Sequence, residues 1–195
     1  MTIFDNDVEA GGAEPPAIPF RDEAGTTVSV WDPIVRLFHW SLVAAFTVAW
    51  LTGDELKHVH EWAGYTIVGL LAIRVIWGFV GTAHARFGNF IYRPSTVMRF
   101  LLDTARFRAR RYLGHNPAGG AMVIALLAML AVITTTGIMM TSDAFWGVEW
   151  VENVHGLAAN LTIALVGLHL AGVLVASVEH QENLVMAMIT GRKRR

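Results

Sequence analysis

Four histidines lie within or at the ends of long apolar segments of this chain: His39, His60, His155 and His169. A histidine at membrane depth usually faces the interior of a helix bundle and serves a functional site. His155 and His169 are 14 residues apart in one apolar run, which is close to four helical turns and a rise of about 21 Å. Their side chains therefore share one helix face at two depths, so that one helix can supply a ligand to each of two stacked haems.

The composition indicates a membrane protein. Of the 195 residues, 54% are hydrophobic and only 16% are charged, whereas about a quarter of the residues of soluble domains are charged. The chain contains no cysteine, which excludes haem attached through C-x-x-C-H, iron–sulfur clusters held by cysteine, and disulfides. Any cofactor must therefore be held by histidine, methionine, carboxylates or the backbone.

Four apolar segments are long enough to cross a bilayer, at about residues 34–53, 61–82, 119–141 and 154–178. Each approaches the roughly 20 residues that a helix needs to span the hydrocarbon core, and helices satisfy their own backbone hydrogen bonds in lipid. We predict an all-α fold, a transmembrane four-helix bundle over residues 29–195. Residues 1–28 are polar and acidic, and we predict that they form a flexible tail.

Charge is distributed unevenly between the two predicted sides of the membrane. One side holds Arg21, Arg36, seven arginines between Arg86 and Arg111, and the basic residues 192–195, whereas the other holds Lys57 and mostly acidic residues. By the positive-inside rule, both termini and the 82–118 loop are cytoplasmic. We therefore expect a multi-pass protein of the bacterial inner membrane. The basic stretch over 99–112 either lies along the lipid headgroups or is a solvated loop that fixes the topology, and we expect no nucleic-acid binding.

The membrane depth of each histidine decides how the histidines pair. Two imidazoles on opposite faces of one haem must lie at nearly the same depth. The first helix runs outward, while the second and fourth run inward. Matching depths pair His60 with His155 near the outer face and His39 with His169 toward the cytoplasm, whereas pairing His60 with His169 would separate the ligands by about four turns. A haem-free metal or proton transporter lined by histidines is the alternative from another functional class.

Further polar residues lie near these predicted sites. Arg74 is within the second apolar segment, where it can pair with a haem propionate or extend to the lipid surface. His115 and Asn116 precede the third segment, where they can either bind a quinone carbonyl or form a capped loop. His58 competes with His60 as a ligand but lies further out in the loop. Glycines beside the ligands would leave room for porphyrins: Gly64, Gly156, Gly167 and Gly172.

Several motifs together resemble the bacterial cytochrome b561 and nickel–iron hydrogenase cytochrome b family of four-helix di-haem membrane proteins. The resemblance covers about residues 28–195. The matching stretches are V-W-D-P-I-V-R-L-F-H-W, H-E-W-A-G-Y, R-V-I-W-G-F-V-G-T, G-H-N-P-A-G-G, V-H-G-L-A-A-N, G-L-H and E-N-L-V-M-A-M-I-T-G-R-K-R. His84, between G-T and A-R-F, departs from the family pattern. From that pattern we expect an aromatic or another polar residue at this position.

The resemblance implies that His39, His60, His155 and His169 are the axial iron ligands of two b-type haems, in the same two pairs. In related formate dehydrogenase subunits, quinone binds near the start of the third helix, where His115 and Asn116 lie. The implied function is electron transfer in a respiratory chain, between a membrane quinone and a periplasmic redox protein such as a c-type cytochrome. The alternatives are a membrane anchor of a hydrogenase or other dehydrogenase complex, and a stand-alone quinone- or superoxide-reactive cytochrome. The resemblance leaves open whether the protein has quinone oxidoreductase activity and whether it forms a homodimer.

Overall fold

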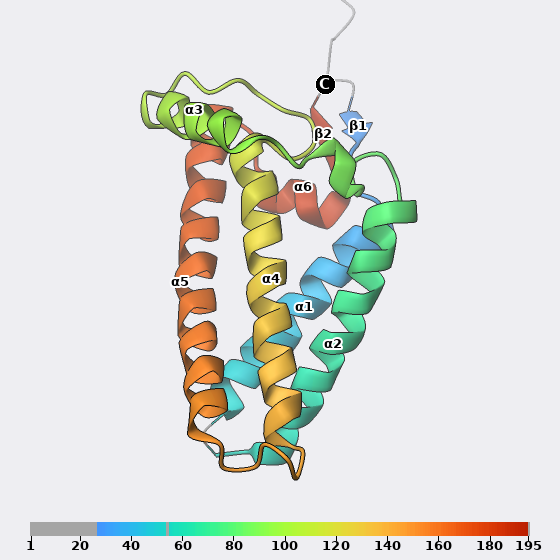
Figure 1. The fold of residues 1–195 in the computed structure, drawn as a ribbon. Coiled ribbons are helices and arrows are strands. Elements are labelled where there is room, and N and C mark those ends of the chain that lie inside the picture. Colours follow the sequence, from blue (N-terminus) through green and yellow to red (C-terminus); the bar gives the residue numbers. More distant parts are fainter. Residues whose placement is uncertain (1–26, 54, 195) are drawn as a thin grey trace, which may run out of the picture.

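Four long helices form the body of the part of the chain that the structure describes. The structure is a computed structural model that describes residues 27–53 and 55–194, so all but the last two residues of the tail predicted over residues 1–28 lie outside it. Each long helix is apolar and long enough to cross a membrane, and consecutive long helices run in opposite directions (Figure 1). The all-α transmembrane bundle is thus confirmed, with helices α1 (Pro33–Thr52), α2 (Lys57–Val80), α4 (Pro117–Met140) and α5 (Glu149–Glu179).

Helices α1 and α4 run in the same direction, and each begins with a side-chain cap followed by a proline. Asp32 precedes Pro33, and its carboxylate accepts a hydrogen bond of 2.9 Å from the backbone N–H of Val35. Asn116 precedes Pro117, and its side-chain oxygen accepts one of 2.6 Å from Gly119. An Asp or Asn cap satisfies an unpaired N–H, and proline fits the first helical position without losing a hydrogen bond. Both starts are therefore fixed by local sequence.

The long helices pack as two pairs, α1 on α2 and α4 on α5, and α2 joins the pairs by packing on α4. The shared core is small and consists of Ala49, Ala63, Ile67 and Leu130. Most large apolar side chains instead face outward, and Leu37, Leu51 and Phe79 are each at least 70% exposed. An apolar exterior around a small core is what a helix bundle surrounded by lipid requires.

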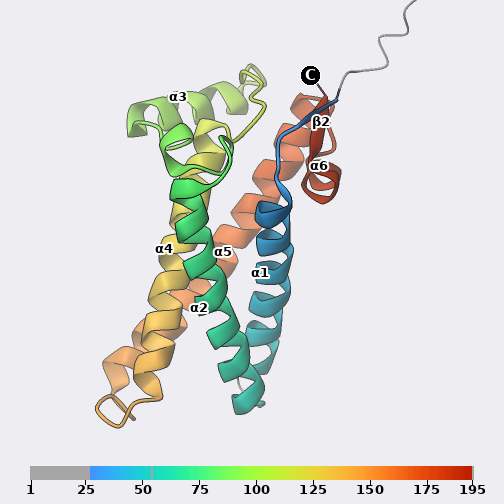
Figure 2. The ribbon, with the colours of Figure 1, turned by 90° about the vertical axis from the view of Figure 1, so that its right-hand side faces the viewer.

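Short elements cover one end of the bundle. We call this end, made of β1, residues 81–116 and residues 180–194, the arginine-rich end. They are β1 (Thr27–Ser29), η1 (Phe87–Asn89), α3 (Pro94–Ala105), α6 (Leu184–Thr190) and β2 (Arg192–Arg194). Helix α3 lies across this end (Figures 1 and 2). Residues 55 and 56 and the loop at 141–148 lie at the opposite end, which we call the acidic end. Strand β1 includes residue 29, where the predicted bundle domain starts, and the basic stretch 99–112 begins within α3 and is helical to Ala105.

The first and last described segments are held together at the arginine-rich end. Strands β1 and β2 pair antiparallel, with Val28 opposite Lys193; we call this pair the terminal clasp. The side chains of Lys193 and Glu182 are both 7% exposed and lie 3.9 Å apart. Glu182 also contacts Arg111 at 3.3 Å, and Lys193 donates a hydrogen bond of 3.3 Å to the carbonyl oxygen of Tyr112. The buried ion pair therefore connects the clasp to the loop before α4.

Candidate functional site

The rings of His60 in α2 and His155 in α5 face each other near the acidic end. Their centroids are 6.0 Å apart and their planes are inclined by 71°. A histidine nitrogen binds a metal at about 2 Å, so two imidazoles on one metal have centroids roughly 6 Å apart. The observed separation fits a single metal atom between the two rings.

The backbone of a neighbouring helix orients each of these rings. The Nδ1 atom of His60 lies 2.8 Å from the carbonyl oxygen of Ala49 in α1, and Nδ1 of His155 lies 3.1 Å from that of Ile133 in α4. A carbonyl oxygen can only accept a hydrogen bond, so each Nδ1 carries the proton and donates it. The Nε2 atoms are then left with a free lone pair, as in metal-binding histidines whose other nitrogen donates to a carbonyl.

The other predicted pair is His39 in α1 and His169 in α5. The two residues lie within electrostatic range of each other. Nδ1 of His39 is buried and has no hydrogen-bond partner within the described part of the chain. Buried polar atoms are almost always paired in folded proteins. An unpaired ring nitrogen inside the bundle therefore fits a site that binds a further group.

The glycines noted in the sequence have open surroundings. A side-chain Cβ atom built on Gly64, Gly156, Gly167 or Gly172 would meet no described atom within 4 Å. The last three of these positions are exposed on α5. A fifth glycine, Gly137, lies directly against the His155 ring, since its Cβ would come within 3.3 Å of Cε1 of His155. Sequence reasoning did not identify Gly137, because only the α4–α5 packing brings it to His155.

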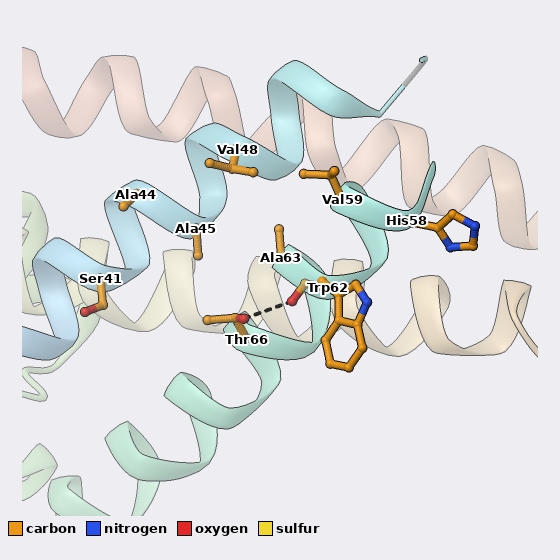
Figure 3. Close-up of a pocket in the computed structure, with 9 residues that line it drawn as sticks. All are labelled: Ser41, Ala44, Ala45, Val48, His58, Val59, Trp62, Ala63 and Thr66. Carbon is orange, nitrogen blue, oxygen red and sulfur yellow. Dashed lines mark hydrogen bonds between the residues drawn. The ribbon is translucent and has the colours of Figure 1, made fainter. Parts of the chain in front are cut away.

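His58 does not join His60. Its side chain is 93% exposed and lines a groove of about 570 Å³ between α1 and α2 that His60 does not line. Figure 3 shows the small side chains of this groove, among them Ser41, Ala44 and Ala45, with the His58 ring beyond its end. The choice of His60 over His58 as the inward-facing residue therefore agrees with their positions.

Arg74 is buried in the protein and does not extend to the lipid surface. It is only 4% exposed, its Nη2 donates a hydrogen bond of 3.2 Å to the carbonyl oxygen of Ala85, and its guanidinium lies 4.8 Å from the ring centroid of Phe87. Its Nη1 atom is buried without a partner among the described residues. A buried cation with a free donor fits an anionic group such as a carboxylate.

His115 and Asn116 have different roles in the structure. His115 lines a cavity of about 280 Å³ at the arginine-rich end, and its ring packs against Trp31 and Phe90 with centroid distances of 4.7 and 4.5 Å. Asn116 does not line this cavity, because its side-chain oxygen caps α4. The remaining lining residues are Ala83, His84, Asn89, Phe90, Tyr92, Tyr112 and Gly114.

The surroundings of His115 keep its ring neutral. Burial, and then the positive charges of Arg74 and Lys193, lower the pKa of His115 to about 3, although a hydrogen bond to the backbone of His84 acts in the opposite direction. At neutral pH the ring therefore has one nitrogen that donates a hydrogen bond and one that accepts. Its Nδ1 atom is buried and unpaired among the described residues. This arrangement suits hydrogen bonding to a neutral polar ligand.

Comparison with known proteins agrees with this architecture. The family model of prokaryotic cytochrome b561 matches residues 30–191. A relative in Bradyrhizobium diazoefficiens is 23% identical over 86% of each chain. One in Azotobacter vinelandii is 26% identical over 67% of this chain and 66% of its own, and one in Rhodobacter capsulatus is 22% identical over 86% of this chain and 82% of its own.

All three relatives are described as probable Ni/Fe-hydrogenase B-type cytochrome subunits. No solved structure matches the chain significantly. The family match extends from the residue before Trp31 to the residue before β2, and so includes the four membrane-spanning helices of the described residues and the four histidines on them. The chain therefore belongs to the prokaryotic cytochrome b561 family, as a multi-pass membrane protein that carries haem b and takes part in electron transfer.

Proposed function

We propose that this protein holds two b-type haems, one between His60 and His155 and one between His39 and His169. In this proposal it carries electrons between a membrane quinone and a redox partner on the periplasmic side. The main support for this proposal is that the centroids of the His60 and His155 rings are 6.0 Å apart. The Nδ1 atoms of both rings are hydrogen-bonded to backbone carbonyls. A bound haem supplies one-electron redox chemistry at its iron.

The residues around the two pairs suit that role. At His60 and His155, donation from Nδ1 to a carbonyl fixes the ring orientation and strengthens Nε2 as a ligand. The spacing of His155 and His169 puts the two pairs about 21 Å apart along α5, which is most of the roughly 30 Å thickness of the hydrocarbon core. Arg74, with its free buried donor, is the proposed partner of a propionate of the haem nearer the arginine-rich end.

The cavity at His115 is the proposed quinone site. A quinone offers two carbonyl oxygens, and a neutral imidazole can donate a hydrogen bond to one of them. Phe90, Tyr92 and Tyr112 supply aromatic surface in the same cavity, which suits a flat ring. Asn116 supports this site only indirectly, by fixing the start of α4 next to His115.

The proposed partner is a hydrogenase or another dehydrogenase, because the relatives are described as hydrogenase cytochrome subunits. The acidic end, with Asp143, Glu149 and Glu152, is the proposed docking face for the partner. A c-type cytochrome is the alternative partner for the same face. Affinity purification from native membranes distinguishes them: a hydrogenase- or dehydrogenase-type complex should co-purify with the protein, whereas recovery of a c-type cytochrome alone would favour the alternative.

Haem analysis of the purified protein tests the central proposal. A pyridine haemochrome assay should give two haems b per chain. His169→Leu should lose one haem and keep the other, while the control His58→Leu, in the exposed groove, should keep both. A protein without haem b would overturn the proposal in favour of a metal or proton transporter. Retention of both haems by His169→Leu would show that the pairing is wrong.

A further inference from the structure

The cavity at the arginine-rich end contains a second histidine, His84, whose residue type the sequence motifs did not explain. We propose that His84 transfers protons between the aqueous phase and the oxygens of a quinone bound beside His115. This inference rests on the quinone reaction proposed above and assigns to it a proton donor and acceptor.

The backbone brings the two histidines to one cavity. His84 follows α2 and His115 immediately precedes the cap of α4, yet both line the same space of about 280 Å³. The His84 ring packs against Gly114, where an added Cβ would lie 2.9 Å from its Nδ1 atom. Because Gly114 has no side chain, the His84 ring can occupy this position next to His115.

The reaction requires protons as well as electrons. Two electrons and two protons convert a quinone into a hydroquinone: each carbonyl becomes a hydroxyl by gaining one O–H bond, and the electrons come from the redox partner by way of the protein. The reverse reaction releases both protons. A cavity that binds the quinone head must therefore contain, or open to, a group that exchanges protons near neutral pH.

Among the groups that face the cavity, His84 alone suits this exchange. His115 lies close to the charges of Arg74 and Lys193 and stays neutral. Phenols such as those of Tyr92 and Tyr112 ordinarily titrate near pH 10, and burial, followed by the neighbouring Tyr112, raises the pKa of Tyr92 further. His84 lines the cavity and is only half-buried, and imidazole commonly serves proteins as a proton donor and acceptor.

The test measures quinone reaction and quinone binding in the haem-loaded protein in lipid nanodiscs. The haems are reduced chemically and mixed with decylubiquinone in a stopped-flow instrument from pH 5.5 to 8.5, and the haem absorbance gives the oxidation rate. In His84→Gln the rate should fall at least tenfold and lose its dependence on pH near neutrality. The affinity for decylubiquinone, measured by quenching of tryptophan fluorescence, should change less than twofold. Added imidazole should restore the rate of His84→Ala.

Two further variants make the outcome decisive. His180→Gln, at the same end of the bundle but outside the cavity, should behave like the wild type. Gly114→Ala keeps every cavity side chain but pushes the His84 ring away, and should lower the rate with unchanged haem spectra. An unchanged rate and pH profile in His84→Gln would overturn the role of His84 while leaving the quinone site intact. Failure of the wild type to react with decylubiquinone would instead overturn the quinone reaction, and this inference with it.

Discussion

At His115, burial and neighbouring charge make protein stability depend on pH. The pKa of this ring is about 3 in the folded protein, whereas an unfolded histidine titrates near 6.5. Between these two values the unfolded chain binds one proton more than the folded chain. The contribution of His115 to stability is therefore greatest above about pH 6.5, and it falls by roughly 1 kcal/mol per pH unit as the pH drops through this range.

His115→Phe tests this dependence, because phenylalanine fills the aromatic site between Trp31 and Phe90 but cannot be protonated. The unfolding midpoint of the wild type in detergent should fall steeply between pH 7 and pH 5, and that of His115→Phe should fall less. His180→Phe serves as a control and should keep the wild-type slope. Equal slopes for the wild type and His115→Phe would contradict the assignment of the buried neutral ring.

The sequence identified residues that meet across the bundle, but not the atoms that orient them. His60 and His155 are recognisable because histidine is rare at membrane depth and because helical rise converts spacing into depth. The carbonyl oxygens of Ala49 and Ile133, which accept from the two rings, have no signature, since every residue has a carbonyl. Only helix packing determines which carbonyl lies beside which ring.

Within α2, two glycines have opposite surroundings. A Cβ on Gly78 would come within 2.0 Å of the Phe87 ring, whereas a Cβ on Gly69 would meet no described atom within 4 Å. Gly78→Ala should therefore displace Phe87, which packs on Arg74, and destabilise the protein by about 1–3 kcal/mol. Gly69→Ala should be neutral or slightly stabilising, because alanine favours helix. Thermal unfolding of both variants checks this contrast, and equal midpoints would refute it.

Hydropathy locates the apolar part of each long helix but not the polar turns at its ends. Each predicted span overlaps one observed helix, but α2 begins at Lys57 and α5 at Glu149, before the predicted starts near 61 and 154. The first turns of these helices are polar, and polar residues tolerate a helix outside the hydrocarbon region. Helix α6 and the strands of the terminal clasp were not predicted, because such short elements exist only through contacts with distant segments.

For the whole molecule, the main prediction concerns orientation in the membrane. The absence of native cysteine allows single cysteines to report on each side. In intact spheroplasts, a membrane-impermeant maleimide should label Asp143→Cys, at the acidic end, and should not label Arg108→Cys, at the arginine-rich end. Both positions are exposed, so inside-out vesicles should give the reverse pattern. Labelling of Arg108→Cys in spheroplasts would place the arginine-rich end outside.

The terminal clasp also determines when the arginine-rich end can complete its folding. Strand β1 precedes all four membrane-spanning helices in the chain and β2 follows them, so their pairing must wait until the fourth helix has been synthesised. The buried Lys193–Glu182 pair and the contacts of Arg111 form only at that point. The arginine-rich end therefore reaches its final packing only after the whole chain has left the ribosome. A chain truncated before β2 would contain all four membrane-spanning helices but could form neither the terminal clasp nor the Lys193–Glu182 pair.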